Sequence, residues 1–248
     1  GMAHEINNPL AGMMQNASVI LNRLTKSSDK NIKAAQNCGT TMDAINSFMA
    51  QRNIIKQLQL IYDSGKRASD IISNMLSFSR KSESRFLETN ISEVMDLSIK
   101  LAENDYDLKK KFDFRKITIK KDYQENLPLC KCDKSKISQV FLNLLKNGAH
   151  AMSEIKDQES VFYIRIYQKN NYLTIEIEDN GPGIPENIRN RIFEPFFTTK
   201  DIGQGTGLGL SVSYFIITDN HRGNMYVESN PGSGTKFIIK LPVSCDEI

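Results

Sequence analysis

The chain has 248 residues, with 32 Lys and Arg against 29 Asp and Glu and a net charge of +3. Such a near balance gives no dominant basic surface, so no nucleic acid partner is expected. No apolar run is long enough to cross a bilayer and no signal peptide is found, so we expect no membrane contact by this segment and a cytoplasmic location.

Four cysteines occur, at Cys38, Cys130, Cys132 and Cys245. Cys130 and Cys132 are separated by one residue, one fewer than in the CxxC pairs of zinc and redox sites, and no second pair follows. We therefore expect reduced thiols without a dedicated role, as in a cytosolic protein.

Two segments in the first third of the chain carry apolar residues at steps of three and four. The first stripe is Ile6, Leu10, Met13, Ala17, Ile20 and Leu24, and the second is Ile55, Leu58, Tyr62, Gly65, Ser69, Ile72 and Leu76. This spacing predicts two helices of an antiparallel hairpin, each with one apolar stripe. Residues 34–52 have weaker helical spacing and are predicted to extend the tip of the hairpin.

Two helices alone enclose little core. The stripes therefore favour pairing with a second copy of the hairpin, which gives a dimeric four-helix bundle. Contact of the stripes with the second half of the same chain is the alternative.

Residues 81–90 are polar and are predicted to form a linker, which divides the chain into domains 1–84 and 85–248. The second domain has an α+β pattern. Helices are predicted over 91–112, 133–155 and 208–219, and strands over 116–123, 161–169, 172–179, 224–229 and 235–241. Asp133 is the expected N-cap of the second of these helices. The order predicts a mixed sheet with helices packed on one face.

The sequence DNGPGI at 179–184 places a carboxylate at the end of a predicted strand. Asp179 could accept a hydrogen bond from the exocyclic amine of adenine, while Gly181 and Gly183 let the backbone approach the base. An ordinary Asx turn that leaves the strand is the alternative.

The sequence GQGTGLGL at 203–210 is rich in glycine and precedes a predicted helix. It lacks the Lys-Ser/Thr of a Walker A loop and the strand–turn–helix setting of a dinucleotide-binding unit. Its exposed amides at a helix N-terminus are nevertheless suited to phosphate.

Asn143 and Asn147 lie four residues apart on one face of the predicted helix 133–155. The amide oxygen of Asn147 suits a Mg²⁺ ion that keeps most of its waters and bridges phosphates, although capping of neighbouring backbone is an alternative. His150, one turn on, could contact phosphate or be a partly exposed helix histidine.

The Asn helix, the DxGxG turn and the GxGxGLGL loop together resemble the ATP-binding (GHKL) domain shared by gyrase, Hsp90, histidine kinases and MutL. FEPFFTTK at 193–200 resembles the lid of histidine kinases in particular. This resemblance covers nearly all of residues 90–242. It implies a Bergerat-type α/β sandwich with ATP and Mg²⁺ as cofactors, and Asn147 as the residue that holds Mg²⁺. Gly148 stands where the family usually has alanine.

The resemblance also implies a nucleotide site contributed by the helix, both glycine segments, the lid and the last strand, where Thr235 supports the adenine-binding aspartate. The implied residues are Asn143, Asn147, His150, Asp179, Gly181, Gly183, Ile184, Phe193, Thr198, Thr199, Lys200, Gly203, Gly205, Thr206, Gly207, Leu208, Gly209, Leu210 and Thr235.

The sequence HEINNPL at 4–10 places His4 and Asn8 one helical turn apart, with Glu5 beside His4. A neutral imidazole is a competent nucleophile near neutral pH, and an adjacent carboxylate can orient it and take up its proton. A solvent-facing histidine near a chain end is the alternative.

HEINNPL, followed by a helical hairpin and then this ATP-binding pattern, resembles the dimerisation and phosphotransfer domain of sensor histidine kinases. The resemblance implies that His4 is the phosphoacceptor, Glu5 the acid/base residue and Asn8 the residue that positions water to dephosphorylate a partner. Two departures stand out: the tip at 34–52 is an insertion, and the first helix is expected to be truncated, with the upstream sensor domain missing.

The function implied is ATP-dependent histidine autophosphorylation and transfer to an aspartate of a response-regulator receiver domain, with a homodimer as the acting species. A conformational ATPase of the gyrase or MutL type would need a catalytic glutamate in the Asn helix, and residues 135–147 contain no acidic residue. A nucleotide-sensing scaffold would have degraded glycine loops, and here they are intact.

Overall fold

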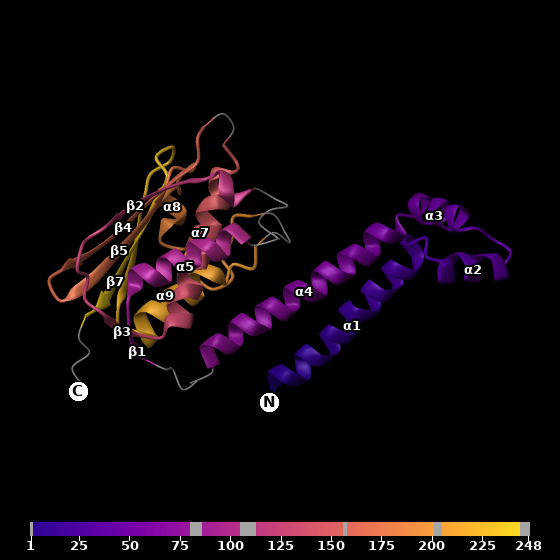
Figure 1. The fold of residues 1–248 in the computed structure, drawn as a ribbon, viewed down its shortest axis with the longest axis horizontal. Coiled ribbons are helices and arrows are strands. Elements are labelled where there is room, and N and C mark those ends of the chain that lie inside the picture. Colours follow the sequence, from indigo (N-terminus) through magenta and orange to yellow (C-terminus); the bar gives the residue numbers. More distant parts are fainter. Residues whose placement is uncertain (1, 80–85, 105–112, 156–157, 201–204, 244–248) are drawn as a thin grey trace. The chain divides into compact units, whose positions relative to one another are not determined.

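The computed structural model describes residues 2–79, 86–104, 113–155, 158–200 and 205–243 (Figure 1). The chain divides into two compact units. Residues 1–79 and 200–206 make up the first unit, and residues 80–199 and 207–248 make up the second. Each unit is described by itself below.

The first unit is helical. Its elements are α1 (Met2–Thr25), α2 (Asp29–Asn37), α3 (Met42–Gln51) and α4 (Ile54–Ser79). The long helices α1 and α4 run side by side (Figure 1), which confirms the predicted hairpin. The tip consists of the two short helices α2 and α3, so it begins a few residues earlier than the sequence suggested.

Local capping explains why the tip breaks into separate helices. The Ser28 hydroxyl accepts a hydrogen bond from the Asn31 amide, and the Thr41 hydroxyl accepts one from Ala44. These side chains satisfy amides that have no partner at a helix start. Gly39, with φ of +69°, provides the left-handed residue after α2.

The hairpin seam is packed through small residues. Ala17 and Gly65 are buried, and a Cβ atom on Gly65 would lie 2.8 Å from Cγ of Met14. Part of the predicted stripe of α1 is not covered in a single chain, because Ile6, Met13 and Ile20 are 43–51% exposed. These three residues are spaced by seven and therefore share one helix face.

The second unit is built on a five-stranded sheet in the order β2-β4-β5-β7-β6. Its strands are β2 (Thr118–Tyr123), β4 (Val161–Lys169), β5 (Tyr172–Asp179), β6 (Asn224–Ser229) and β7 (Thr235–Pro242). The pair β2–β4 is parallel and the other pairs are antiparallel, so the predicted mixed sheet is confirmed.

Helices α5 (Ile91–Asn104), α7 (Lys134–Met152) and α9 (Gly209–Phe215) cover one face of this sheet (Figure 1). Fully buried aliphatic and aromatic side chains from α7 meet those of β4 and β5 to form the core. They include Ile137, Phe141, Leu144, Leu145, Ile164, Ile166, Leu173 and Ile175.

Several details differ from the sequence prediction. Part of the predicted linker is a strand, β1 (Leu87–Thr89), which pairs with β3 (Cys130–Cys132) in a separate two-stranded sheet. Three-residue strands carry too little alternation to be recognised. The short helix α8 (Glu186–Arg189) was not predicted. The predicted helix 208–219 is divided into α9 and a π-helical turn, Ile216–Asn220.

Two predicted helices are longer than the described ones. The predicted helix 91–112 corresponds to α5 up to Asn104, and residues 105–112 lie outside the described part. Helix α7 ends at Met152, three residues before the predicted end. Among the described residues Cys38, Cys130 and Cys132 form no disulfide, and Cys245 lies outside the described residues. None of the helices described is both long and apolar enough to cross a membrane.

Candidate nucleotide site

Asp179 ends β5 with its side chain buried beneath α7, at 5% exposure. Its Oδ1 accepts hydrogen bonds from the amides of Gly181 (2.9 Å) and Thr235 (3.3 Å). Burial raises the pKa of Asp179 to about 6, although the two amide hydrogen bonds oppose this rise. Oδ2 makes no hydrogen bond within the described residues. Asp179 thus forms the Asx turn considered above and also keeps one acceptor oxygen available.

The glycines after Asp179 are required by close backbone contacts. Gly183 has φ of +76°, and a Cβ atom there would overlap the carbonyl oxygen of Asn230. The Gly232 amide donates to the carbonyl of Pro182 at 2.7 Å. The DNGPG turn is therefore locked against the turn between β6 and β7, which would be crowded by any side chain at 183.

A row of buried side chains runs across the inner face of the sheet at this end. Cross-strand pairing places Phe162 beside Asp179, Asp179 beside Thr235, and Thr235 beside Ser229. All four are at most 6% exposed. Ser229 was not singled out from the sequence. Ser229 reaches the site because the strand register pairs it with Thr235. In the sequence, its position at the end of β6 is the feature that could have pointed to it.

Helix α7 brings its amide side chains to the same region. Asp133 caps the helix by accepting hydrogen bonds from Ser135 and Lys136, as predicted. The Asn143 amide donates to the carbonyl of Gly209 and to the hydroxyl of Ser213, both at 3.2 Å. Asn143 therefore joins α7 to the start of α9.

The next turn of α7 carries two further predicted residues. Asn147 is half-buried, and its side chain has no hydrogen bond within the part of the chain described here. Its amide is therefore available to a ligand. His150 is also half-buried, and its Nδ1 lies 3.4 Å from the Glu154 carboxylate.

Gly148 lies between Asn147 and His150 in the sequence and packs against Phe162 and Asp179 of the sheet. A Cβ atom at Gly148 would be 2.6 Å from Cε1 of Phe162 and 3.1 Å from Oδ2 of Asp179. The ring of Phe162 fills the space that the usual alanine methyl would take. This glycine thus makes room for an aromatic residue beside the carboxylate.

The lid segment begins in contact with α9. The rings of Phe193 and Tyr214 are 5.0 Å apart, centroid to centroid. Phe196 is exposed and has φ of +67°. Its backbone packs against Gly207, where a Cβ atom would overlap the carbonyl carbon of Phe196. Thr198 and Thr199 are exposed. Gly203 lies outside the described residues.

The remaining predicted residues lie close to these elements along the chain. Leu208 is buried, whereas Lys200, Gly205, Thr206, Gly207, Gly209 and Leu210 are half-buried. Ile184 donates its amide to the Ser229 hydroxyl at 2.8 Å. The structure therefore brings together Asp179, Gly181, Ile184, Thr235 and the Gly148–Ala151 stretch of α7.

The predicted phosphoacceptor segment lies in the first turns of α1. The side chains of His4 and Glu5 lie outside the described set, while Asn8 is exposed. In the described residues no group of three or more His, Cys, Asp or Glu side chains could hold a metal ion.

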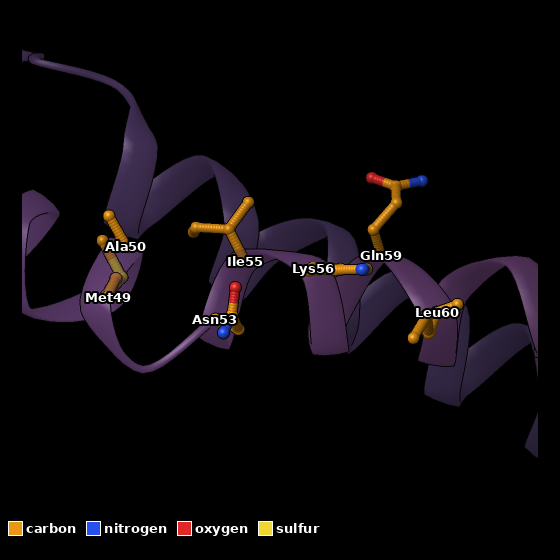
Figure 2. Close-up of a pocket in the computed structure, with 7 residues that line it drawn as sticks. All are labelled: Met49, Ala50, Asn53, Ile55, Lys56, Gln59 and Leu60. Atoms are coloured by element: carbon orange, nitrogen blue, oxygen red, sulfur yellow. The ribbon is translucent and has the colours of Figure 1, made fainter.

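A second concave surface lies in the helical unit. A groove of about 480 Å³ opens between the end of α3 and the first turns of α4 (Figure 2), lined by Met49, Ala50, Asn53, Ile55, Lys56, Gln59 and Leu60. None of the predicted site residues lines this groove.

The family model of the histidine kinase-, DNA gyrase B- and HSP90-like ATPases matches residues 132–244. Sensor kinase CckA of Brucella abortus is 32% identical over 259 residues, which cover 100% of this chain and 24% of CckA. Sensory histidine kinase/phosphatase NtrB of Rhodobacter capsulatus is 30% identical over 259 residues, which cover 100% of this chain and 62% of NtrB. The chain thus spans about a quarter of the first relative and under two thirds of the second.

Solved structures agree with these relatives. The catalytic domain of histidine kinase ThkA has 31% identity and a TM-score of 0.53, with 63% of this chain and 95% of that domain covered. ThkA in complex with response regulator protein TrrA has 22% identity and a TM-score of 0.60, with 97% and 61% covered, which shows a shared fold along almost the whole chain. With a buried carboxylate, the Asn helix and the glycine turns in place, the chain belongs to the sensor histidine kinases.

Proposed function

We propose that this chain uses ATP to phosphorylate His4 and then passes the phosphoryl group to an aspartate of a response-regulator receiver domain. Residues 1–84 would act as the dimerisation and phosphotransfer domain and residues 85–248 as the ATP-binding domain, in the cytoplasm. The observation that carries this proposal is the buried Asp179, whose Oδ2 remains available as an acceptor while Oδ1 holds the turn.

Asp179 is ionised at neutral pH because its pKa is about 6. The carboxylate then accepts a hydrogen bond from the exocyclic amine of adenine. The glycine turns let the base approach the backbone. The remaining predicted residues of the lid and the glycine loop would bind the phosphates. The contacts to the adenine base thus help to hold the terminal phosphate in position for transfer.

Asn147 would hold Mg²⁺ together with the phosphates of ATP. Its unbonded amide fits this role, since an amide oxygen is a hard, neutral ligand for an ion that keeps several waters. Mg²⁺ supplies neutralisation of phosphate charge when bound. His150, half-buried one turn further along α7, would face the phosphate side of the site.

In the transfer step, an imidazole nitrogen of His4 forms a bond to the γ-phosphorus while the bond from that phosphorus to the bridging oxygen of ADP breaks. Glu5 takes up the ring proton. In the second step the P–N bond breaks, and a carboxylate oxygen of the receiver aspartate takes the phosphoryl group. Positioning and charge neutralisation contribute most of the rate in such reactions.

Two further roles follow for the helical unit. Asn8, exposed one turn after His4, would position the water that dephosphorylates the partner, an activity named for the relative NtrB. The exposed residues Ile6, Met13 and Ile20 would be covered by a second copy in a four-helix bundle. The receiver domain as partner is supported by the complex of ThkA with TrrA.

The test is incubation of the chain with γ-labelled ATP and Mg²⁺. We expect an acid-labile, base-stable phosphoprotein that is lost in His4→Gln and in Asn147→Ala, whereas Asn224→Ala, an exposed site on β6, retains it. Label that is acid-stable, or that survives His4→Gln, contradicts the proposal. ATP hydrolysis without label indicates the conformational ATPase, and binding without either indicates the scaffold.

A further inference from the structure

We propose that Ser229 determines the preference of this site for a 6-amino purine over a 6-oxo purine by fixing the direction of the Thr235 hydroxyl. This inference rests on the nucleotide site proposed above and adds a residue that would not touch the ligand. Ser229 would be a positioning residue that acts through Thr235.

The Ser229 hydroxyl has three neighbours, and its bonding capacity allows only one arrangement that satisfies them all. It donates to the carbonyl oxygen of Gly234 at 2.7 Å, and it accepts from the amide of Ile184 at 2.8 Å. The third neighbour is the Thr235 hydroxyl at 3.0 Å. A hydroxyl has one hydrogen and two lone pairs.

The single hydrogen of Ser229 is committed to the Gly234 carbonyl, because a carbonyl oxygen cannot donate. One lone pair is committed to the Ile184 amide, because an amide N–H cannot accept. The bond between the two hydroxyls must therefore run from Thr235 to Ser229. Ser229, Gly234 and Thr235 are buried and Ile184 is half-buried, so an arrangement that leaves one of these groups unsatisfied would be costly.

This polarity changes what Thr235 can offer to a ligand. With its hydrogen turned toward Ser229, the Thr235 oxygen keeps two lone pairs and acts only as an acceptor. Its cross-strand neighbour on the same face of the sheet is Asp179, whose Oδ2 is also an unbonded acceptor within the described residues. Cross-strand register thus makes the two residues that carry these acceptors direct neighbours on one face of the sheet at this end of the site.

Two neighbouring acceptors match a group with two hydrogens, which is the amine of a 6-amino purine. A 6-oxo purine would present an oxygen to both acceptors and would be rejected. Rejection of a ligand that leaves buried polar groups unpaired is stronger than discrimination by size. The acceptor pair extends recognition from Asp179 alone to Asp179 together with Thr235.

The test compares equilibrium binding of ATP and ITP to the whole chain and to Ser229→Ala. Loss of the serine hydroxyl frees the Thr235 hydroxyl to rotate and donate to the oxygen of ITP. We expect the ATP/ITP affinity ratio to fall about tenfold, the size of one hydrogen bond. A purely structural role for Ser229 would weaken both nucleotides equally, and an unchanged ratio overturns the inference.

A double-mutant cycle shows whether Ser229 acts through Thr235. In a Thr235→Val background, Ser229→Ala should leave the ratio unchanged, and a full tenfold fall there contradicts the relay. Ser229→Cys keeps the shape of the side chain, although sulfur is larger, and offers a weaker donor and acceptor, so it should give an intermediate ratio; it replaces Ser229→Ala if that variant does not fold. If the unaltered chain binds neither nucleotide, the proposed function itself fails; if it prefers ATP and the ratio never moves, only this inference fails.

Discussion

The ring of Phe162 occupies the space directly above Gly148, with Cε1 2.6 Å from where a Cβ atom would stand. Helix α7 and strand β4 approach closely here because the glycine has no side chain. The ring also lies 6.1 Å from that of Phe114, centroid to centroid, so it has little freedom to move away.

Gly148→Ala should therefore destabilise the second unit by about 1–2 kcal/mol. Overpacking costs about 1–3 kcal/mol, and the better helix propensity of alanine offsets up to about 1 kcal/mol of it. Urea unfolding measures the change. Gly12→Ala, in α1 with nothing within 4 Å, is the control and should be neutral or stabilising. If steric crowding is the cause, the penalty must shrink in a Phe162→Leu background.

Asp179→Asn should stabilise the nucleotide-free protein while weakening ATP binding about ten- to hundredfold. The folded-state pKa of about 6 lies above the ordinary value of 3.8, so the fold favours the protonated form. Stability from this group is complete below pH 3.8 and is lost as the pH rises through 6. The gain from the variant should grow from about 1 kcal/mol at pH 4.5 to about 3 kcal/mol at pH 7.5.

Urea unfolding of Asp179→Asn at these two pH values, without nucleotide, is the measurement. Asp122→Asn, at an exposed position on β2, provides the matched control and should change neither stability nor affinity. A variant that is less stable than the unaltered chain at pH 7.5 would show that the amide hydrogen bonds outweigh burial.

His221 is buried and joins two helices in its neutral form. Its Nε2 accepts from the Asp133 amide at 3.1 Å, so Nδ1 carries the hydrogen and donates to the Ile216 carbonyl at 2.7 Å. Burial lowers the pKa of His221 despite the opposing effect of that carbonyl. His221→Phe should destabilise the second unit by about 2–3 kcal/mol at pH 7.5, because both partners lose their bond.

The pH dependence of this loss has a definite sign. A lowered folded-state pKa gives stability that is present above the ordinary value of 6.5 and is lost as the pH falls through the folded pKa. The difference between the unaltered chain and His221→Phe should therefore narrow from pH 7.5 to pH 5.5. The titration of Asp179 changes the stability of both proteins equally and cancels in this comparison. A difference in unfolding free energy that stays constant from pH 7.5 to pH 5.5 would therefore rule out a neutral, buried His221.

Asn143→Ala should lower ATP affinity about tenfold, because its amide joins α7 to the start of α9 through Gly209 and Ser213. Asn143→Asp should be worse, since a carboxylate cannot donate and would face the Gly209 carbonyl. Calorimetric titration measures both variants. Equal affinities for the alanine and aspartate variants would show that the hydrogen bond polarity at this joint has no effect on binding.

The sequence predicted the long elements well for identifiable reasons. Strands 161–169 and 172–179 have the predicted bounds because their alternation is regular and Asn170, with φ of +56°, closes the turn between them. Asp133 was recognisable as a cap because its side chain precedes a helical apolar pattern.

What the sequence did not reveal depends on contacts between distant segments. β1 and β3 are defined by pairing with each other rather than by any pattern of their own. The role of Ser229 arises from cross-strand register, and the fit of Phe162 against Gly148 arises from the approach of a helix to a strand. Neither relation leaves a periodic signal, so both require the folded chain.

The interlocked turns at Pro182–Gly183 and Asn230–Gly234 limit which loops of this protein can accept insertions or substitutions during evolution. Gly234 has φ of +81°, and a Cβ atom there would overlap the carbonyl oxygen of Asp179. A lengthened or altered loop between the last two strands would therefore displace the base-recognising acid, even though the two are far apart in the chain. We expect inserted residues to be tolerated after Lys169, where β4 turns into β5 at the far end of the sheet, and not between β6 and β7.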